Sequence, residues 1–379
     1  PKNNINALMD VAVADGKIVA VAPGIEAARA KRIINAKGLI VTPGIIDLHG
    51  HHFYGTQPDS YLSNGFSALP PDGFTFRSGV TTVVDAGGAG WKNFSTFKEQ
   101  TIDRSKTRVL SFINIVGSGM KGGKVEQNID DMDPGQTAKL AREYPGLIVG
   151  VKLAHFSGPN WVPLDRVVEA GRIAEIPVMI DFGGSNPALS IEELFLEKLR
   201  PGDIFTHAYA HVKGRVPIVD EKGIVKPFVF KAKERGIIFD VGHGGGSFDF
   251  EQAVPAMKQG LKPDAISTDL HTGSMNAGMK DMSNVMSKFL NMDMPVKEVI
   301  ACSTSKPAEI INRNDLGHLS VGAEADIAVF KVLEGSFGFV DTKGKKMAGD
   351  KKLQCELTLR GGKVVWDLNG IAVESNSDY

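Results

Sequence analysis

The stretch that most constrains the fold is residues 39–55, where an apolar run stops at three histidines within four residues. The run is typical of a strand covered on both faces. Side chains two apart on a strand point the same way, so His49 and His51 are expected to converge and His52 to face elsewhere. Two imidazoles offer nitrogen ligands to a divalent ion such as zinc, and Gly50 lets the backbone turn nearby. The stretch therefore predicts a metal site, with ordinary core or surface histidines as the alternative.

Length and charge narrow the class of protein. At 379 residues the chain can hold one large α/β barrel, typically about 250 residues, plus a smaller domain. The formal net charge of -1 gives no general basic field, which argues against nucleic-acid binding. Cys302 and Cys355 are too few for a disulfide framework and fit a reducing, cytoplasmic location, although a single structural pair stays open. No apolar run approaches the roughly 20 residues that cross a membrane, so no membrane partner is expected.

Four further polar residues interrupt or end expected strands. The strands are predicted at 147–154, 176–182, 203–209 and 265–269, and the polar residues are, in the same order, Lys152, Asp181, His207 and Asp269. Because the carboxyl ends of parallel barrel strands form one mouth, these side chains and the two histidines are expected to gather there. For His207 a satisfied core histidine is the alternative, and for Asp269 a capping role.

The residues 41–51 resemble the first barrel strand of the amidohydrolase superfamily, most closely its dihydroorotase-like amidohydrolase/deacetylase and D-aminoacylase branch. The resemblance covers nearly the whole chain. It implies one or two divalent ions, zinc first, bound by His49, His51 and His207, with Asp269 as both a ligand and the catalytic base. Asp181 stands where members usually carry a histidine, so it either ligates the second ion or leaves a single-metal site.

The resemblance also assigns a role to Lys152. A bare ammonium in a dry barrel is costly, so this lysine is expected to be paired, deprotonated or modified. A buried lysine with a lowered pKa can react with carbon dioxide, and the resemblance implies such a carboxylated lysine bridging two metal ions. The alternative is an ordinary lysine paired with Asp181 or Asp269.

The expected fold is an α/β (β/α)8 TIM-type barrel with a small flanking β-sandwich made by both chain ends. Residues 10–22 alternate around Asp15-Gly16, the signal for a tight hairpin. Short strands separated by glycine-rich turns are expected again after residue 316. The predicted division is therefore residues 1–42 and 313–379 for the β-sandwich and 43–312 for the barrel.

The substrate pocket is expected to draw on loops at the barrel mouth. The sequence GHGGGSF at residues 242–248 cannot hold a helix, and its successive N–H groups could receive a carbonyl or carboxylate oxygen. A loop without such contacts is the alternative. The candidate substrate-binding residues are His155, His211, His243, Gly245 and Gly246.

Together these features predict a metal-dependent hydrolase that cleaves an amide or ester bond of a small molecule, deacetylase- or dihydroorotase-like. A metal would lower the pKa of water, and Asp269 would accept its proton. Two alternatives stay open. One is a deaminase of a nucleobase-like substrate, against which Lys152 argues, because single-metal deaminases generally lack that lysine. The other is a non-catalytic binding or assembly protein, which Asp181 would permit. A homo-oligomer is compatible with the family resemblance.

Overall fold

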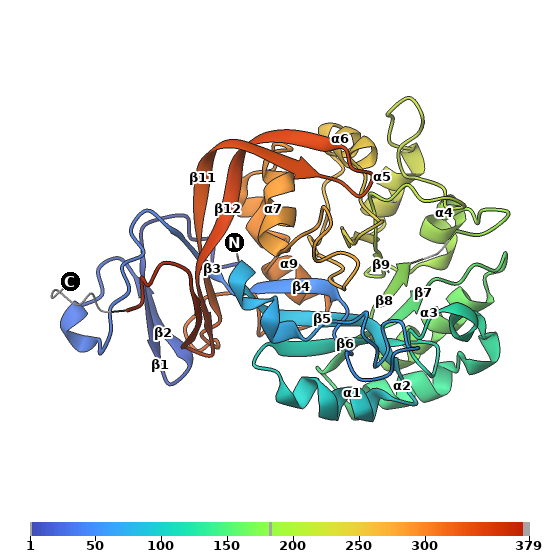
Figure 1. The fold of residues 1–379 in the computed structure, drawn as a ribbon, viewed down its shortest axis with the longest axis horizontal. Helices are drawn as coiled ribbons and strands as arrows, with labels where there is room; N and C mark the ends of the chain where they lie inside the picture. Colours follow the sequence, from blue (N-terminus) through green and yellow to red (C-terminus); the bar gives the residue numbers. More distant parts are fainter. Residues whose placement is uncertain (1, 182–183, 374–379) are drawn as a thin grey trace.

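The computed structural model describes residues 2–181 and 184–373. Its centre is a curled sheet of seven parallel strands in the spatial order β10-β9-β8-β7-β6-β5-β4, so each strand lies beside its neighbour along the chain (Figure 1). The strands are β4 (Ile45–Gly50), β5 (Val80–Gly90), β6 (Arg108–Asn114), β7 (Ile148–Ala154), β8 (Val178–Asp181), β9 (Ile204–Phe205) and β10 (Ile238–Phe239). Four of them, β4, β7, β8 and β9, lie within the ranges where the sequence predicts barrel strands.

Residues 265–270, which include the eighth strand predicted at 265–269, contact both edges of this sheet. Ala265 pairs in parallel with Asp240, which follows β10, and Leu270 pairs in parallel with Gly50 at the end of β4. The sheet therefore curls until its two edges share one neighbour, as in a TIM-like barrel.

Two apolar clusters lie on opposite faces of the curled sheet. The inner cluster includes Ile46 and Leu48 of β4, while Ile45 belongs to the larger cluster under the surrounding helices. Simple alternation would send His49 to the helix side with Ile45. The pairing of β4 with β5 becomes irregular between Asp47 and Gly50, and an irregularity of this kind re-aims side chains. This irregularity is why His49 faces the barrel mouth.

Helices surround the sheet, and Ala308 of α9 also contributes to the inner apolar cluster. They are α1 (Phe94–Gln100), α2 (Pro134–Glu143), α3 (Val162–Ala174), α4 (Ile191–Glu193), α5 (Pro227–Glu234), α6 (Phe250–Lys258), α7 (Met282–Leu290), α8 (Val296–Ala301) and α9 (Ser305–Ile310). Two of these helices, α2 and α6, have similar N-termini. Each begins after an aspartate, Asp133 or Asp249, whose carboxylate accepts a backbone N–H of the first turn, so both helices carry an ordinary N-cap.

Both chain ends contribute to the flanking sheets. β1 (Asp10–Ala14) and β2 (Lys17–Ala22) form an antiparallel hairpin whose turn residues Asp15 and Gly16 both have positive φ, as the sequence predicts. The second sheet has the order β13-β12-β11-β3. It pairs β3 (Ile40–Pro43) with β11 (Ile327–Val340), and adds β12 (Lys346–Arg360) and β13 (Lys363–Asp367). Apolar residues from both sheets share one cluster.

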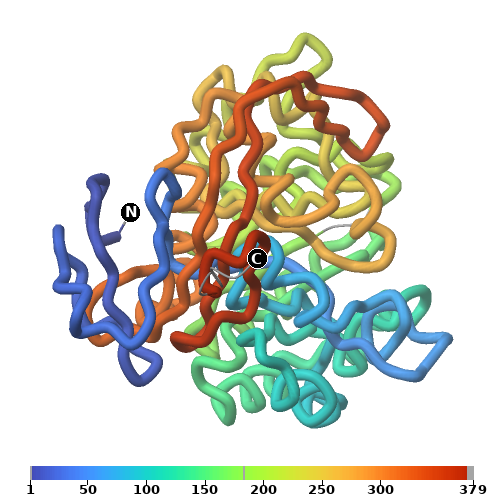
Figure 2. Tube along the Cα trace, turned by 60° about the vertical axis from the view of Figure 1, so that its left-hand side comes forward, coloured from blue at the N-terminus to red at the C-terminus, as the bar shows by residue number. Residues whose placement is uncertain are grey.

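The prediction of short strands after residue 316 is wrong for β11 and β12. They form one long antiparallel hairpin, with strands of 14 and 15 residues. In Figure 2 this hairpin is the red tube that leaves the flanking sheets and runs along the molecule. The hairpin packs on α7, where the Ser287 hydroxyl accepts the N–H of Leu353. Two of its glycines, Gly338 and Gly349, lie within paired strand, while Gly335 lies at an irregularity of the pairing and Gly344 in the turn of the hairpin.

Among the described residues, no helix has the length and apolar character needed to span a membrane.

Candidate metal centre and substrate pocket

Three predicted ligands meet at the carboxyl ends of the strands. One ligand atom from each of His49, His207 and Asp269 lies within 4.8 Å of the others, and all three residues are buried. His51 adjoins this cluster, because its Nε2 lies 2.9 Å from Asp269 Oδ1. Three parts of the chain thus come together at one point: the end of β4, His207 just after β9, and residues 265–270.

His49 is held so that one nitrogen faces the cluster. The Thr206 hydroxyl donates to Asp240 Oδ2 at 2.7 Å, so it accepts from His49 Nδ1–H at 2.8 Å. The Nε2 atom therefore carries the free lone pair and points toward Asp269, at 3.6 Å from Oδ1. Burial holds the pKa of His49 well below its usual value, and the nearby Lys152 lowers it further. A neutral imidazole whose other ring nitrogen donates to a fixed acceptor, here a hydroxyl that is itself bonded to Asp240, is the form that binds a metal.

His207 shows the same arrangement. Its Nδ1–H donates to the carbonyl of Gly242 at 2.5 Å, which leaves a lone pair on Nε2, 3.2 Å from Asp181 Oδ2. That nitrogen can bind a metal ion or share a proton with Asp181, so the two side chains lie close enough to hold one cation between them. His51 Nδ1 is buried and without a hydrogen-bond partner. The donor set of imidazoles and carboxylates therefore fits a divalent metal.

Lys152 is fully buried on β7 beside the cluster. Its Nζ lies 3.4 Å from His49 Nε2 and 3.5 Å from Met179 Sδ, and burial lowers its pKa. No carboxylate in the described part of the chain lies within ion-pair distance of this amine. The simple pairing with Asp181 or Asp269 that the sequence left open is therefore not found.

Asp181 lies at the end of β8 among basic groups. Besides His207, it faces His155 Nε2 at 3.6 Å and Arg215 Nη1 at 3.8 Å. Burial alone would raise the pKa of this carboxyl, but His207 and Lys152 hold it well below its usual range. For Asp269, the hydrogen bond from His51 and the charges of His271 and His51 outweigh burial and lower its pKa to about 2. Both carboxyls are thus anionic ligand candidates.

Backbone strain accompanies the site. His155, His207 and Asp269 all have φ between 50° and 56°, a left-handed conformation that residues other than glycine rarely adopt. Each follows a barrel strand or the segment that closes the sheet. Strained residues of this kind gather at functional sites, where surrounding contacts over-determine them.

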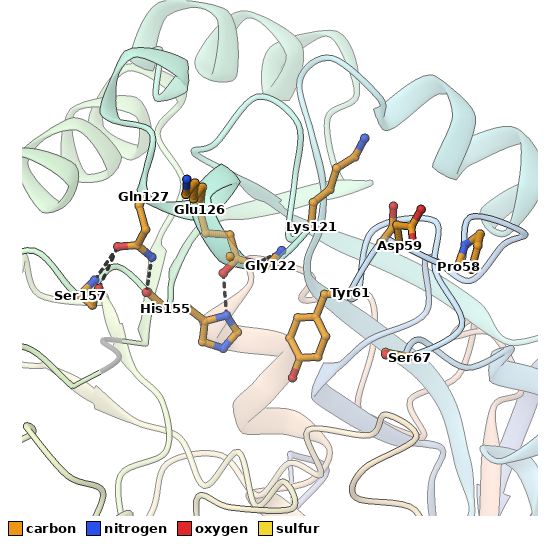
Figure 3. A pocket seen from close by; sticks show the side chains of 13 residues that line it. Pro58, Asp59, Tyr61, Ser67, Lys121, Gly122, Glu126, Gln127, His155 and Ser157 are labelled. Atoms are coloured by element: carbon orange, nitrogen blue, oxygen red, sulfur yellow. Dashed lines mark hydrogen bonds and ion pairs between the residues drawn. The ribbon is translucent and has the colours of Figure 1, made fainter.

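An open pocket of about 1080 Å³ (Figure 3) has none of the candidate ligands in its lining, and His155 links it to the cluster. It is lined by three loops, at 55–72, 117–133 and 154–161, which include Tyr61, Glu126 and His155. The rings of Tyr61 and His155 face each other with centroids 6.0 Å apart. His155 Nδ1 contacts Glu126 Oε2 at 2.7 Å, and Nε2 is the atom that faces Asp181. His155 therefore connects the pocket to the ligand cluster.

The other predicted pocket residues lie differently. His211 is exposed, and His243 is fully buried, with its ring nitrogens bonded to Lys288 and to the carbonyl of Gly244. Gly245 and Gly246 are not among the residues lining the pocket in Figure 3. Their roles in substrate binding stay predictions.

Sequence reasoning missed Tyr61, which lies on a loop, and Glu126, which lies on a short 3-10 helix at residues 123–127. Burial and the charges of Asp269 and Glu126 raise the pKa of Tyr61 to about 12, so its phenol stays protonated as a hydrogen-bond donor. Only the length of the two loops, each too long for an ordinary βα connection, pointed to this part of the chain.

Comparison with known proteins decides the family. The model of the amidohydrolase family matches residues 246–365. The deacetylase Atu3266 of Agrobacterium fabrum is 35% identical over 341 residues, covering 87% of this chain and 80% of that protein. The chain belongs to the amidohydrolase family. A deacetylase of Enterococcus faecalis is 29% identical over 364 residues, 94% of this chain and 95% of the relative.

Two solved structures agree with this assignment. A dihydroorotase crystal structure has a TM-score of 0.83 and 31% identity, and an adenine deaminase crystal structure has a TM-score of 0.86 and 26% identity. Each comparison covers at least 95% of both chains. The amidohydrolase described here is a metal-dependent hydrolase acting on carbon–nitrogen bonds, which confirms the sequence prediction of an enzyme.

Proposed function

We propose that this amidohydrolase is a deacetylase-like enzyme that hydrolyses an acyl amide of a small molecule. The observation that carries the proposal is the convergence of His49, His207 and Asp269, with ligand atoms within 4.8 Å of one another, beside an open pocket. His49, His51, Lys152, Asp181, His207 and Asp269 would hold one or two divalent ions, with zinc the best match for imidazole and carboxylate donors. When bound, such an ion polarises a carbonyl and lowers the pKa of water.

The protein's own residues supply orientation and proton transfer. The back-bonded His49 and His207 keep their Nε2 lone pairs directed at the centre. Asp269 is anionic and has the reach to accept a proton from the attacking water, then to return it to the leaving nitrogen. Tyr61 and His155 line the pocket next to the centre, where their polar atoms can orient the substrate carbonyl.

We propose that Lys152 carries a carbamate when two ions are present. Its amine is fully buried and has a lowered pKa, which makes it nucleophilic toward carbon dioxide. The reaction forms an N–C bond and releases one proton, converting an unpaired buried amine into an anionic ligand. Isotope-labelled carbon dioxide should then give a carbamate resonance that disappears in Lys152→Ala.

A deaminase of a nucleobase-like substrate is the second candidate. The adenine deaminase structure at TM-score 0.86 favours it. The buried lysine beside the ligands favours hydrolysis of an acyl amide, for which deacetylases are the relatives of highest identity given above. As for architecture, we propose an eight-stranded (β/α)8 barrel at residues 43–312, with 265–270 as the last strand, and a β-sandwich made by 1–42 and 313–379.

The test is hydrolysis of a panel of N-acetyl amino acids and cyclic ureides by purified protein, with metal content measured on the same sample. We expect bound divalent metal, loss of hydrolysis on chelation and recovery on adding zinc back. Asp269→Asn should lower kcat by about 10²–10⁴-fold, as expected for the loss of a general base, and leave metal largely bound.

The matched control is Asp103→Asn, an exposed aspartate paired with Lys98, which should retain full activity. Retained turnover in Asp269→Asn would refute its role as base. Release of ammonia from adenine, without hydrolysis of any acyl amide, would favour the deaminase instead.

A further inference from the structure

The backbone of the loop at residues 242–246 lies between two of the candidate metal ligands. The carbonyl of Gly242 accepts the Nδ1–H of His207, and the N–H of Gly244 donates to the carbonyl of Thr268 at 2.9 Å. A Cβ added to Gly244 would lie 2.3 Å from Asp269 Oδ2. The position of this loop therefore determines the orientation of His207 and the space available to Asp269.

The side chain of His243 points away from the pocket and anchors this loop to the interior. It is fully buried, and its ring stacks on Phe248 with centroids 4.5 Å apart and planes 14° apart. Its Nδ1 lies 2.9 Å from the carbonyl oxygen of Gly244, so Nδ1 carries the hydrogen. In the neutral ring, Nε2 is then an acceptor, and it lies 2.5 Å from Lys288 Nζ.

Lys288, on α7, is also fully buried, although no catalytic step uses it. Its Nζ lies 2.8 Å from the carbonyl of Gly278 and 2.7 Å from that of Val340, in addition to His243. All three partners are acceptors, which matches the three hydrogens of an ammonium. Burial lowers the pKa of Lys288 to about 7, while Asp341 raises it. The rings of Phe248 and Phe250 also lie within 6 Å of the ammonium.

The β11–β12 hairpin holds the other end of the same loop. The N–H of Phe248 donates to the Thr342 hydroxyl, that hydroxyl lies 2.6 Å from the carbonyl of Phe248, and the N–H of Phe250 donates to Asp341. Val340, which accepts from Lys288, is the last residue of β11. The loop is thus held by the end of the hairpin directly and through Lys288.

We propose that Lys288 is a positioning residue of the active site, which acts through His243 to hold residues 242–244 against His207 and Asp269. The inference rests on the metal site proposed above. It assigns a function to the buried end of the GHGGGSF sequence that is distinct from substrate binding. It also makes the flanking hairpin part of the support of the metal centre.

The experiment compares metal affinity, by competition with a chelator, and kinetic constants in three variants. Lys288→Met keeps the apolar stem and removes the three donors, and His243→Phe keeps the stacked ring and removes the acceptor. Because loss of a partner of a metal-binding histidine typically costs 10–100-fold, we expect each to lower metal affinity or kcat by about that factor. KM should change by less than about threefold, since the pocket loops are untouched.

The double variant Lys288→Met/His243→Phe tests whether the lysine acts through the histidine. If it does, the double variant should be no worse in kcat or metal affinity than the worse single variant. Full additivity would overturn the proposal. If Lys288→Met does not fold, His243→Phe decides alone, because it breaks the same link from the loop side.

Two controls separate positioning from general stability. Asp281→Ala removes the N-cap of α7, where the carboxylate accepts the N–H of Asn284, and should cost about 1 kcal/mol of stability without changing kcat or metal affinity. Lys331→Met alters an exposed lysine of β11 and should change nothing. If the wild-type protein bound no metal and hydrolysed no substrate, the proposed function itself would be contradicted. If the wild type were active and both Lys288→Met and His243→Phe kept its metal affinity and kcat, only this inference would be contradicted.

Discussion

Arg215 is the buried cation that closes the polar side of the ligand cluster. Its Nη2 donates to the backbone carbonyls of Thr206 and His207 at 3.0 and 3.2 Å, and its Nη1 faces Asp181. The guanidinium carbon lies 4.4 Å from the centroid of the Phe205 ring. The single planar guanidinium thus contacts the strained backbone at His207, the buried carboxylate of Asp181 and the face of the Phe205 ring.

Arg215→Lys should therefore be destabilising despite the retained charge. A single ammonium cannot reproduce the planar fork or the stacking, and at least one buried carbonyl loses its donor. We expect a loss of about 1–3 kcal/mol, measured as a lower midpoint of urea unfolding. Arg104→Lys, at an exposed arginine, is the control. Equal midpoints for the two variants would contradict the structural role given to Arg215.

The candidate ligands could be predicted because each is a polar residue that breaks an apolar strand. His49, Lys152, His207 and Asp269 carry this signal, and the rule that barrel sites lie at the carboxyl ends brings them together. The direction of His243 could not be predicted, because after it the chain has three glycines and its orientation depends on Lys288, 45 residues away. Tyr61, on a loop, and Glu126, on a short 3-10 helix, lie in segments whose course is set by tertiary contacts alone.

At the scale of elements, close packing between neighbouring strands sets the barrel core. Gly150 of β7 is paired with Phe112 of β6, and the ring occupies the space that a larger residue at 150 would need. The strands themselves were predictable from their β-branched and apolar runs. The long β11–β12 hairpin was not, because its internal glycines resemble turn signals, whereas pairing between the two strands keeps Gly338 and Gly349 extended.

Gly150→Ala should destabilise the protein although alanine is a better strand former. The added Cβ would lie 2.2 Å from Phe112 Cδ1 and 2.9 Å from the carbonyl of Pro177, so the ring or the backbone must move. Overpacking of this kind costs about 1–3 kcal/mol. Gly73→Ala is the matched control, since nothing lies within 4 Å of its added Cβ, and it should stay within about 0.5 kcal/mol of wild type. Urea unfolding of both variants measures the loss of stability. Equal unfolding midpoints would show that the added methyl group at position 150 causes no strain.

For the whole molecule, the two cysteines report on the integrity of the packed core. Cys302 and Cys355 are both free and buried, so the structural disulfide that the sequence left open is not formed. Burial raises the pKa of both thiols, and that of Cys355 to about 12. Each thiol is therefore shielded and protonated at neutral pH.

We expect neither thiol to react with Ellman's reagent in the native protein and both to react after denaturation. The raised pKa of Cys355 also determines in which direction the stability of the fold changes with pH. Between its unfolded value of 9.0 and about 12, the folded state keeps a proton that the unfolded state has lost, so stability should fall as pH rises above 9. Cys355→Ala should reduce this slope. Rapid labelling of the native protein would mean that the core opens readily.

The pairing of β3 with β11 also has a consequence for the order in which the protein is made. Barrel strands β4 to β10 each pair with the strand synthesised just before or after, so the curled sheet can grow as the chain leaves the ribosome. Within residues 2–181 and 184–373, β3 pairs with β11 alone, across nearly 300 residues, and must wait for it. The flanking sheet is therefore the last part to close, and the hairpin that closes it is the one that steadies the active-site loop. The enzyme becomes catalytically competent only after the β11–β12 hairpin has been made.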